Sequence, residues 1–247
     1  MIAIDLKRML RDPGVLFIIG VPVLMYLIFG AAQNYGQESA ANGNLAMAIM
    51  VDMAAYGAVA ATASLASQAG VEKLQGWGRQ ISLTPLTAGR YALNKSLTAA
   101  AFALITVAII YAVAAPTGAK GTAWAWVGSF LIVAVGALPF ALVGLALSYV
   151  MRSQSATSVV NALVLLFAFA GNLFVPLSGK LLEASRFTPM WGYITLARWP
   201  VAEGMWTTGQ GEAYTDELWQ ALVSFGVWTA VFIGLAALAL RRRGERQ

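Results

Sequence analysis

The sequence predicts an all-α integral membrane protein, built as a bundle of helices that cross the bilayer. The chain of 247 residues is 59% hydrophobic and only 11% charged, whereas a soluble domain carries about 25% charged residues. Its mean hydropathy is +0.70. Apolar runs that approach the roughly 20 residues of a membrane-spanning helix recur along the whole chain. The length fits one bundle, so we treat 1–247 as a single transmembrane domain.

Residues 1–13 predict an amphipathic helix ahead of the first span. Ile2, Leu6 and Leu10 fall on one face, whereas Lys7 and Arg8 lie on the others. Such a helix lies in the membrane interface and keeps its basic groups among the lipid headgroups. A basic tail without regular structure is the alternative.

Six apolar segments approach the length that a membrane-spanning helix needs, and we expect each to cross the bilayer. The first contains Pro22, which should kink the helix. The second and third are rich in small residues, which allow helices to approach closely in lipid. The six expected spans are about 14–32, 45–69, 91–115, 124–149, 156–175 and 218–240.

The distribution of lysine and arginine predicts the orientation of the chain. Both chain ends and the loops after the second and fourth spans hold 12 of the 16 basic residues, and the other three loops hold four. Cytoplasmic loops are enriched in Lys and Arg. We therefore expect a multi-pass protein of the cell inner or plasma membrane with both termini cytoplasmic. The same bias accounts for the net charge of +5, so we expect no nucleic-acid partner.

The segment 176–217, between the fifth and sixth spans, is expected to lie outside the cell. It is too long for a simple turn and too apolar for a solvated loop. Short helices that are broken by proline and re-enter the outer leaflet, with Trp at the interface, fit this composition. An ordinary exposed loop is the alternative. The residues concerned are Pro176, Pro189, Pro200, Trp191, Trp199 and Trp206.

The stretch 71–95 is the longest polar interruption in the first half of the chain. Val71, Leu74, Trp77 and Ile81 recur at helical spacing and share one face. Pro85 cannot continue this helix. The pattern predicts a short amphipathic helix outside the bilayer, held between two spans. An ordinary cytoplasmic loop with a solvated basic face is the alternative.

This stretch resembles the E-x-x-x-G … T-P-L … K pattern of ABC-2 type permeases, the membrane subunits of one class of ATP-binding-cassette exporters. The matching residues are Glu72, Gly76, Thr84, Pro85, Leu86 and Lys95. In that family the stretch is the coupling helix, which sits in a groove of the ATPase subunit. The resemblance implies that the contact with the ATPase is made by Glu72, Gly76, Trp77, Arg79, Thr84 and Pro85. The family often has a second acid two residues before the glycine, where this chain has Leu74.

Two further regions resemble the same family. Arg11-Asp12-Pro13, followed by an apolar run with Pro22, is similar to its elbow and first span. Pro189 and Arg198 are similar to its short extracellular helices between the last two spans.

The resemblance implies a transporter that works as a dimer. The second permease is a copy of this chain or a related one, and two cytoplasmic ATPase subunits carry the ATP–Mg. The expected role is export of an amphiphilic or lipid-like compound, as in drug or antibiotic resistance. Export of a polysaccharide or glycolipid, an ion-driven secondary transporter and a membrane anchor without transport are the alternatives.

Several kinds of chemistry are excluded by composition. The chain has no histidine and no cysteine, which excludes disulfides and Cys/His metal sites. It also lacks the G-x-x-x-x-G-K-[ST] phosphate loop. We therefore expect no enzyme activity and no cofactor in this chain.

Three polar residues within the spans are candidates for a substrate pathway: Asp52, Asn161 and Asn172. A carboxylate inside a membrane is costly and is a functional candidate by default. For Asp52 we favour a position near the outer interface or in a water-filled cavity, where it stays hydrated. Asp52→Asn should then leave substantial transport. The two asparagines are expected either to bond across helices or to line a cavity.

Overall fold

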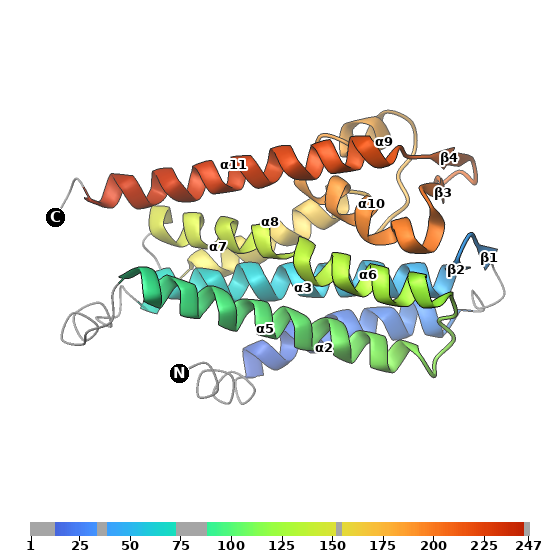
Figure 1. Cartoon of the computed structure of the whole chain (residues 1–247), viewed down its shortest axis with the longest axis horizontal. Helices are drawn as coiled ribbons and strands as arrows, with labels where there is room; N and C mark the ends of the chain where they lie inside the picture. Colours follow the sequence, from blue (N-terminus) through green and yellow to red (C-terminus); the bar gives the residue numbers. More distant parts are fainter. Residues whose placement is uncertain (1–12, 34–38, 73–87, 152–154, 245–247) are drawn as a thin grey trace.

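The computed structural model describes residues 13–33, 39–72, 88–151 and 155–244. Over these residues the protein is mostly helical, with two small antiparallel hairpins. The long helices lie side by side along one axis (Figure 1). The expected elbow helix lies outside the described residues except for Pro13. The expected coupling helix lies outside them except for Val71 and Glu72, which end the helix α3.

The described helices follow the predicted spans closely. Four helical stretches are long and apolar enough to cross a membrane: Leu45–Gln68, Leu97–Ala114, Ala123–Met151 and Leu218–Ala239. Two further apolar helices, Phe17–Ala31 and Ala156–Ala170, are shorter. The elements are α2 (Pro13–Tyr26) with the π-helical turn η1 (Leu27–Ala31), α3 (Leu45–Glu72), α5 (Ala88–Ala114), α6 (Ala123–Gly136), α7 (Leu138–Met151), α8 (Ala156–Ala170) and α11 (Leu218–Gly244). These helices bear out the expected all-α membrane protein.

Successive segments run in opposite directions, so the bundle has two distinct ends. At the left of Figure 1, which we call the terminal end, α2 begins, α3 ends, α5 begins and α11 ends. The right of the view, which we call the hairpin end, carries β1 (Ser39–Ala40), β2 (Gly43–Asn44), β3 (Met205–Thr207) and β4 (Ala213–Thr215). The segment between α3 and α5 therefore starts and finishes at the terminal end.

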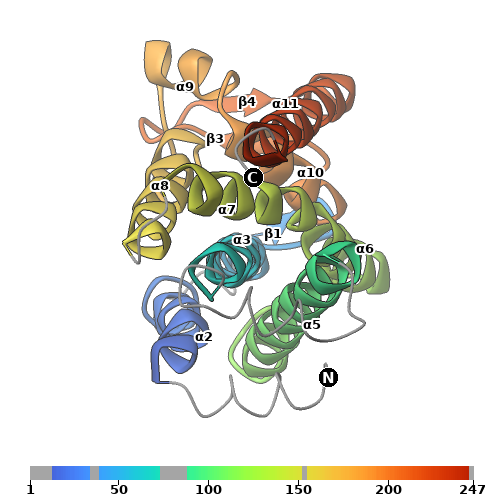
Figure 2. The same cartoon turned by 90° about the vertical axis from the view of Figure 1, so that its left-hand side faces the viewer.

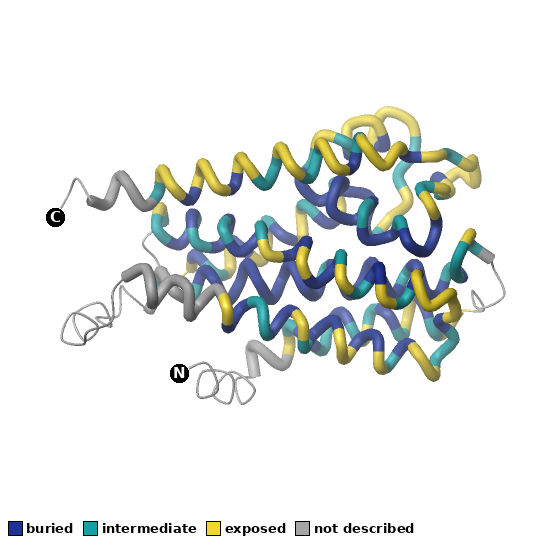
Figure 3. The backbone as a smooth tube through the Cα atoms, viewed as in Figure 1, coloured by how far each residue is buried: buried dark blue, intermediate teal, exposed yellow. Residues whose placement is uncertain are grey.

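The helix α3 is the centre of the bundle. It packs against α2, α5, α7, α8 and α10, and the end-on view shows it enclosed by them (Figure 2). Almost every residue from 46 to 67 is buried, whereas one face of α11 is exposed along its length (Figure 3). Small side chains permit this close packing. At Gly144 of α7, a methyl group would lie 2.0 Å from the carbonyl oxygen of Ala63, so the two backbones touch.

The fourth predicted span is two helices rather than one, with a break at Ala137. Pro139 has no N–H to donate, and its ring would clash with the carbonyl of residue 135 in a continuous helix. The hydroxyl of Thr62, on α3, donates to the carbonyl of Ala137 at 3.0 Å. In the first span, by contrast, α2 continues through Pro22, and the helix departs from α geometry only at η1.

The fifth helix is shorter than predicted and ends at Ala170 instead of about residue 175. Asn172 follows with a φ of 62°, a left-handed conformation that asparagine tolerates better than most residues. Its side-chain oxygen accepts a hydrogen bond from the N–H of Leu177 at 2.8 Å. The turn is therefore closed by Asn172, four residues before Pro176.

The segment between α8 and α11 contains the two expected short helices, α9 (Gly179–Ser185) and α10 (Pro189–Ala202). The helix α10 is largely buried and packs against α3, α6, α8 and α11. Trp191 is 2% exposed within this packing, so the expectation that it lies at an interface is wrong. The β3–β4 hairpin follows α10 and was not predicted.

Candidate functional site

A buried ion pair joins α10 to the central helix near the hairpin end. Arg198 of α10 donates from Nε to Oδ1 of Asp52 at 2.6 Å and from Nη2 to Oδ2 at 2.7 Å. The two side chains are 10% and 5% exposed. Paired donors of a guanidinium match the two oxygens of a carboxylate, which makes this the strongest geometry for such a pair. Asp52 is therefore neutralised by a partner within the bundle.

Arg198 makes further contacts that satisfy its charge. Its Nη2 donates to the carbonyl oxygen of Asn172 at 3.0 Å and lies 3.4 Å from that of Leu173. Its guanidinium carbon lies 4.3 Å from the ring centroid of Trp206, within the range of a cation–π interaction. One arginine thus connects α3, the turn after α8, α10 and strand β3.

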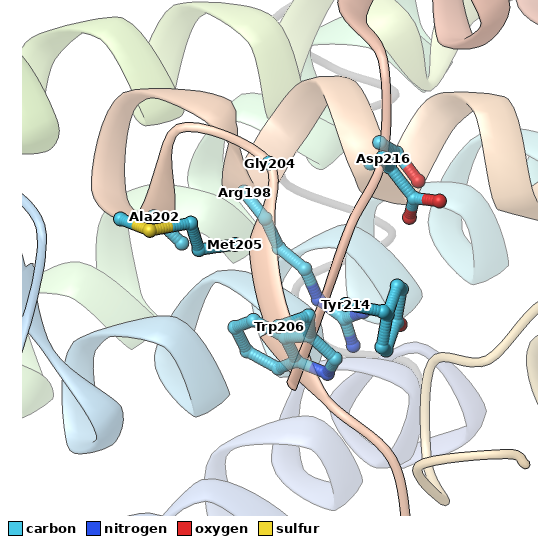
Figure 4. A pocket seen from close by; sticks show the side chains of 8 residues that line it. Arg198, Ala202, Gly204, Met205, Trp206, Tyr214 and Asp216 are labelled. Carbon is cyan, nitrogen blue, oxygen red and sulfur yellow. The ribbon is translucent and has the colours of Figure 1, made fainter. Parts of the chain in front are cut away.

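The hairpin is attached to the same cluster through its second strand. Trp206 faces Tyr214 in the β3–β4 register. The hydroxyl of Tyr214 accepts a hydrogen bond from Nδ2 of Asn172 at 2.8 Å. Figure 4 shows Trp206 and Tyr214 beside the side chain of Arg198.

A second ion pair lies beyond the hairpin. Nη2 of Arg186 is 3.2 Å from Oδ1 of Asp216, whose side chain is only 6% exposed. Burial raises the pKa of Asp216 above its usual value, although the nearby Arg186 guanidinium opposes this shift. Burial likewise raises the pKa of the Tyr214 hydroxyl.

A small pocket lies between the ion pair and the hairpin. Its volume of about 10 Å³ is the space that one water molecule needs, so in this conformation it has no room for an organic ligand. The described residues hold no group of three or more Asp, Glu, His or Cys that could bind a metal. The residues around the pocket are Thr195, Arg198, Ala202, Gly204, Met205, Trp206, Tyr214 and Asp216.

The three predicted pathway residues do not form one site. Asp52 and Asn172 meet at Arg198, so the hydrated carboxylate that we expected at Asp52 is replaced by a buried ion pair. Asn161 instead accepts a hydrogen bond from Ser64 of α3. Ser64 is twelve residues further along α3 than Asp52, or roughly 18 Å along the helix axis. Asn161 therefore bonds across helices in a different part of the bundle.

The predicted contact with an ATPase falls mostly outside the described residues. Glu72 is the last residue of α3. The other five residues, Gly76, Trp77, Arg79, Thr84 and Pro85, lie outside the described part of the chain.

Sequence reasoning named Arg198 and Trp206 only as parts of the external segment and did not place either of them beside Asp52. The signal was present, because α10 is an apolar helix with a single charge and α3 carries a single charge within its span. Two opposite charges that are each isolated in apolar helices are best satisfied by one another. No sequence pattern predicted that Trp206 and Tyr214 lie beside Arg198, since their position depends on the turn between β3 and β4.

Comparison with known proteins adds no assignment, because neither any protein-family description nor any curated protein matches the chain.

Proposed function

We propose that this chain is the membrane subunit of an ATP-binding-cassette exporter, of the ABC-2 permease type. The observation that carries the proposal is the stretch that follows Glu72, with its E-x-x-x-G … T-P-L … K pattern. Its placement in the bundle supports this role. The segment joins the end of α3 to the start of α5 at the terminal end, where α2 begins and α11 ends. An ATPase bound there would push directly on the central helix.

In this proposal all six apolar segments cross the membrane. The alternating directions of the six segments support this, since each runs opposite to the segment before it. The two shorter helices, Phe17–Ala31 and Ala156–Ala170, cross together with residues next to them or where the bilayer is locally thinner. The helices α9 and α10 are then the short re-entrant helices between the last two spans.

The terminal end faces the cytoplasm in this proposal. The loops and ends on that side hold 12 of the 16 Lys and Arg residues, as the positive-inside rule requires. The membrane is the cell inner or plasma membrane. The hairpin end with the Asp52–Arg198 pair lies on the external side.

The energy comes from partner subunits. The sequence has no phosphate loop, so ATP–Mg binds two ATPase subunits, and a second permease completes the complex. The cargo is amphiphilic or lipid-like, as in drug or antibiotic export. The large apolar side chains exposed along α2, α8 and α11 support a pathway in contact with lipid.

The ion-driven alternative is weakened by the ion pair. A carrier driven by protons needs a carboxylate that can bind and release a proton during transport. Both oxygens of Asp52 are held by Arg198, so neither is free to take up a proton unless this pair breaks. The alternative of glycan export concerns only the cargo and leaves the rest of the proposal unchanged.

The test is affinity purification of the tagged chain from its native membranes. An ATPase subunit with a phosphate loop should co-purify with the wild-type chain. Gly76→Leu should weaken this association, because a side chain at that position would hold the two surfaces apart. Gly234→Leu is the control, since a Cβ atom at that position meets no other atom within 4 Å. The proposal would be contradicted if no ATPase co-purified with the wild-type chain. It would also be contradicted if Gly76→Leu retained as much ATPase as Gly234→Leu.

A further inference from the structure

The β3–β4 hairpin lies over the Asp52–Arg198 ion pair at the hairpin end. Trp206 of β3 stacks on the guanidinium of Arg198 at 4.3 Å. Tyr214 of β4 accepts the hydrogen bond from Asn172. Figure 4 shows the two rings on either side of the arginine. The hairpin therefore separates the pair from the solvent beyond it.

Within the two strands, only two side chains attach the hairpin to the bundle. Trp206 and Tyr214 are its half-buried strand residues, whereas the other residues of both strands are exposed. In the turn, residues 209 to 212 are exposed, whereas Thr208 is buried and the backbone of Gly209 lies against the carbonyl of Pro176. A segment with few buried contacts opens at a lower free energy than the core around it. The hairpin can therefore open at a lower free energy than the helix core, once the contact of its turn with Pro176 is released.

The base of the hairpin has the geometry of a hinge. Glu203 and Gly204 both have positive φ angles, 51° and 83°, and they separate α10 from β3. A side chain at position 204 would lie 2.5 Å from the carbonyl oxygen of Asp216, so only glycine fits. The N–H of Asp216 donates to the carbonyl of Gly204 at 2.9 Å. This bond lets both strands move as one unit.

We propose that the β3–β4 hairpin is a hinged cap over the Asp52–Arg198 ion pair. In the closed state Trp206 covers the guanidinium and Tyr214 holds the cap through Asn172. In the open state water reaches Arg198. Charges attract far more weakly in water than in a protein interior, so opening the cap loosens the hold of α10 on α3. The device belongs to this chain alone and does not depend on the proposed ATPase partner.

The test measures access to the pocket beneath the cap with a single cysteine. The chain has no cysteine of its own, so Thr195→Cys introduces one reporter. Thr195 borders the pocket and is 6% exposed. The purified protein is labelled with a small water-soluble thiol reagent, and the rate is compared with and without Tyr214→Phe. That change removes the hydroxyl and leaves the ring, so it weakens the closed state without making a hole.

We expect Thr195→Cys to react slowly in the wild-type background and about fivefold faster with Tyr214→Phe, in line with the loss of one hydrogen bond. Thr207→Cys, on the exposed side of β3, is the reference and should react quickly at one rate in both backgrounds. Ala58→Cys, which is fully buried, should stay unlabelled and so reports that the bundle is intact. Equal rates at Thr195→Cys in the two backgrounds would overturn the cap. So would a wild-type rate as fast as that of Thr207→Cys.

Discussion

Arg198 and Asp52 form a two-bonded ion pair at 2.6 and 2.7 Å that ties a short buried helix to the central helix of the bundle. The residues are 146 positions apart in the sequence. Removing two charges from water is costly, and a hydrophobic pair of similar volume is often as stable. We therefore explain the pair by its effect on the position of α10 against α3, rather than by a gain in the free energy of unfolding.

The first prediction concerns this pair. Asp52→Asn leaves the Arg198 charge buried without a counter-charge, which costs about 3–5 kcal/mol. We expect the melting temperature in detergent to fall by on the order of 10 °C. The double variant Asp52→Leu/Arg198→Met should lose less than Asp52→Asn alone. This replaces the expectation from sequence that Asp52→Asn is tolerated.

Glu212→Gln, at an exposed site on the hairpin turn, is the control and should melt with the wild type. The buried ion pair would be contradicted if Asp52→Asn melted at the temperature of this control. It would also be contradicted if the double variant were as unstable as the sum of its two single variants.

The second prediction concerns the contact between α3 and α7. In Gly144→Ala the new methyl group would lie 2.0 Å from the carbonyl oxygen of Ala63, so the helices must move apart. Overpacking of this kind costs about 1–3 kcal/mol. Gly234→Ala, where the methyl group has open space, should be neutral or slightly stabilising. Thermal unfolding of both variants in one detergent checks the contact, and equal melting temperatures would show that the helices are further apart than described.

The third prediction concerns the break between α6 and α7. Thr62→Val keeps the shape of the side chain but removes the hydroxyl that donates to Ala137. The Ala137 carbonyl keeps the N–H of Phe140 as a donor at 3.2 Å, and the Thr62 hydroxyl also reaches carbonyls of its own helix. Loss of the hydrogen bond between the helices should therefore cost about 1 kcal/mol. Thr106→Val is the matched control, because its hydroxyl donates within its own helix, to Phe102. Chemical unfolding should show a larger loss for Thr62→Val, and a loss no larger than that of the control would refute a special role for Thr62.

The fourth prediction concerns the orientation of the chain in the membrane. Single cysteines are introduced at Gln75 and Glu212, and intact cells are treated with an impermeant thiol reagent. The twelve-to-four division of basic residues predicts labelling of Glu212→Cys and protection of Gln75→Cys. Permeabilised cells, in which both should react, are the control. Labelling of Gln75→Cys alone would require the opposite orientation.

Much of the fold could be predicted from the sequence, because lipid imposes a length and a polarity on each span. The helix limits of α3, α5 and α11 follow directly from their apolar runs. The break at Ala137 had a visible cause in Pro139, but a proline does not always end a helix, as Pro22 within α2 shows. The early end of α8 depends on Asn172, whose side chain closes the turn with Leu177.

The candidate site was only half predictable. Asp52 stood out because a carboxylate inside an apolar helix is rare. Its partner Arg198 was assigned to an external segment, because the isolated charge of this apolar helix was not matched with that of Asp52. The position of α10 inside the bundle follows from its packing against α3, α6 and α11. The covering hairpin depends on the positive φ angles at Glu203 and Gly204, which no sequence pattern revealed.

The measurement that tests the proposed exporter most directly is ATP hydrolysis by the permease and its ATPase together in lipid vesicles. The ATPase subunit alone, the wild-type complex and complexes carrying Glu72→Lys, Gly76→Leu, Trp77→Asp and the control Gly234→Leu are compared. We predict that the wild-type and Gly234→Leu permeases change the hydrolysis rate equally and that the three variants of the coupling stretch lose this effect. The same rate in all five complexes would contradict a coupling role for the stretch after α3, and with it the assignment of this chain as an exporter subunit.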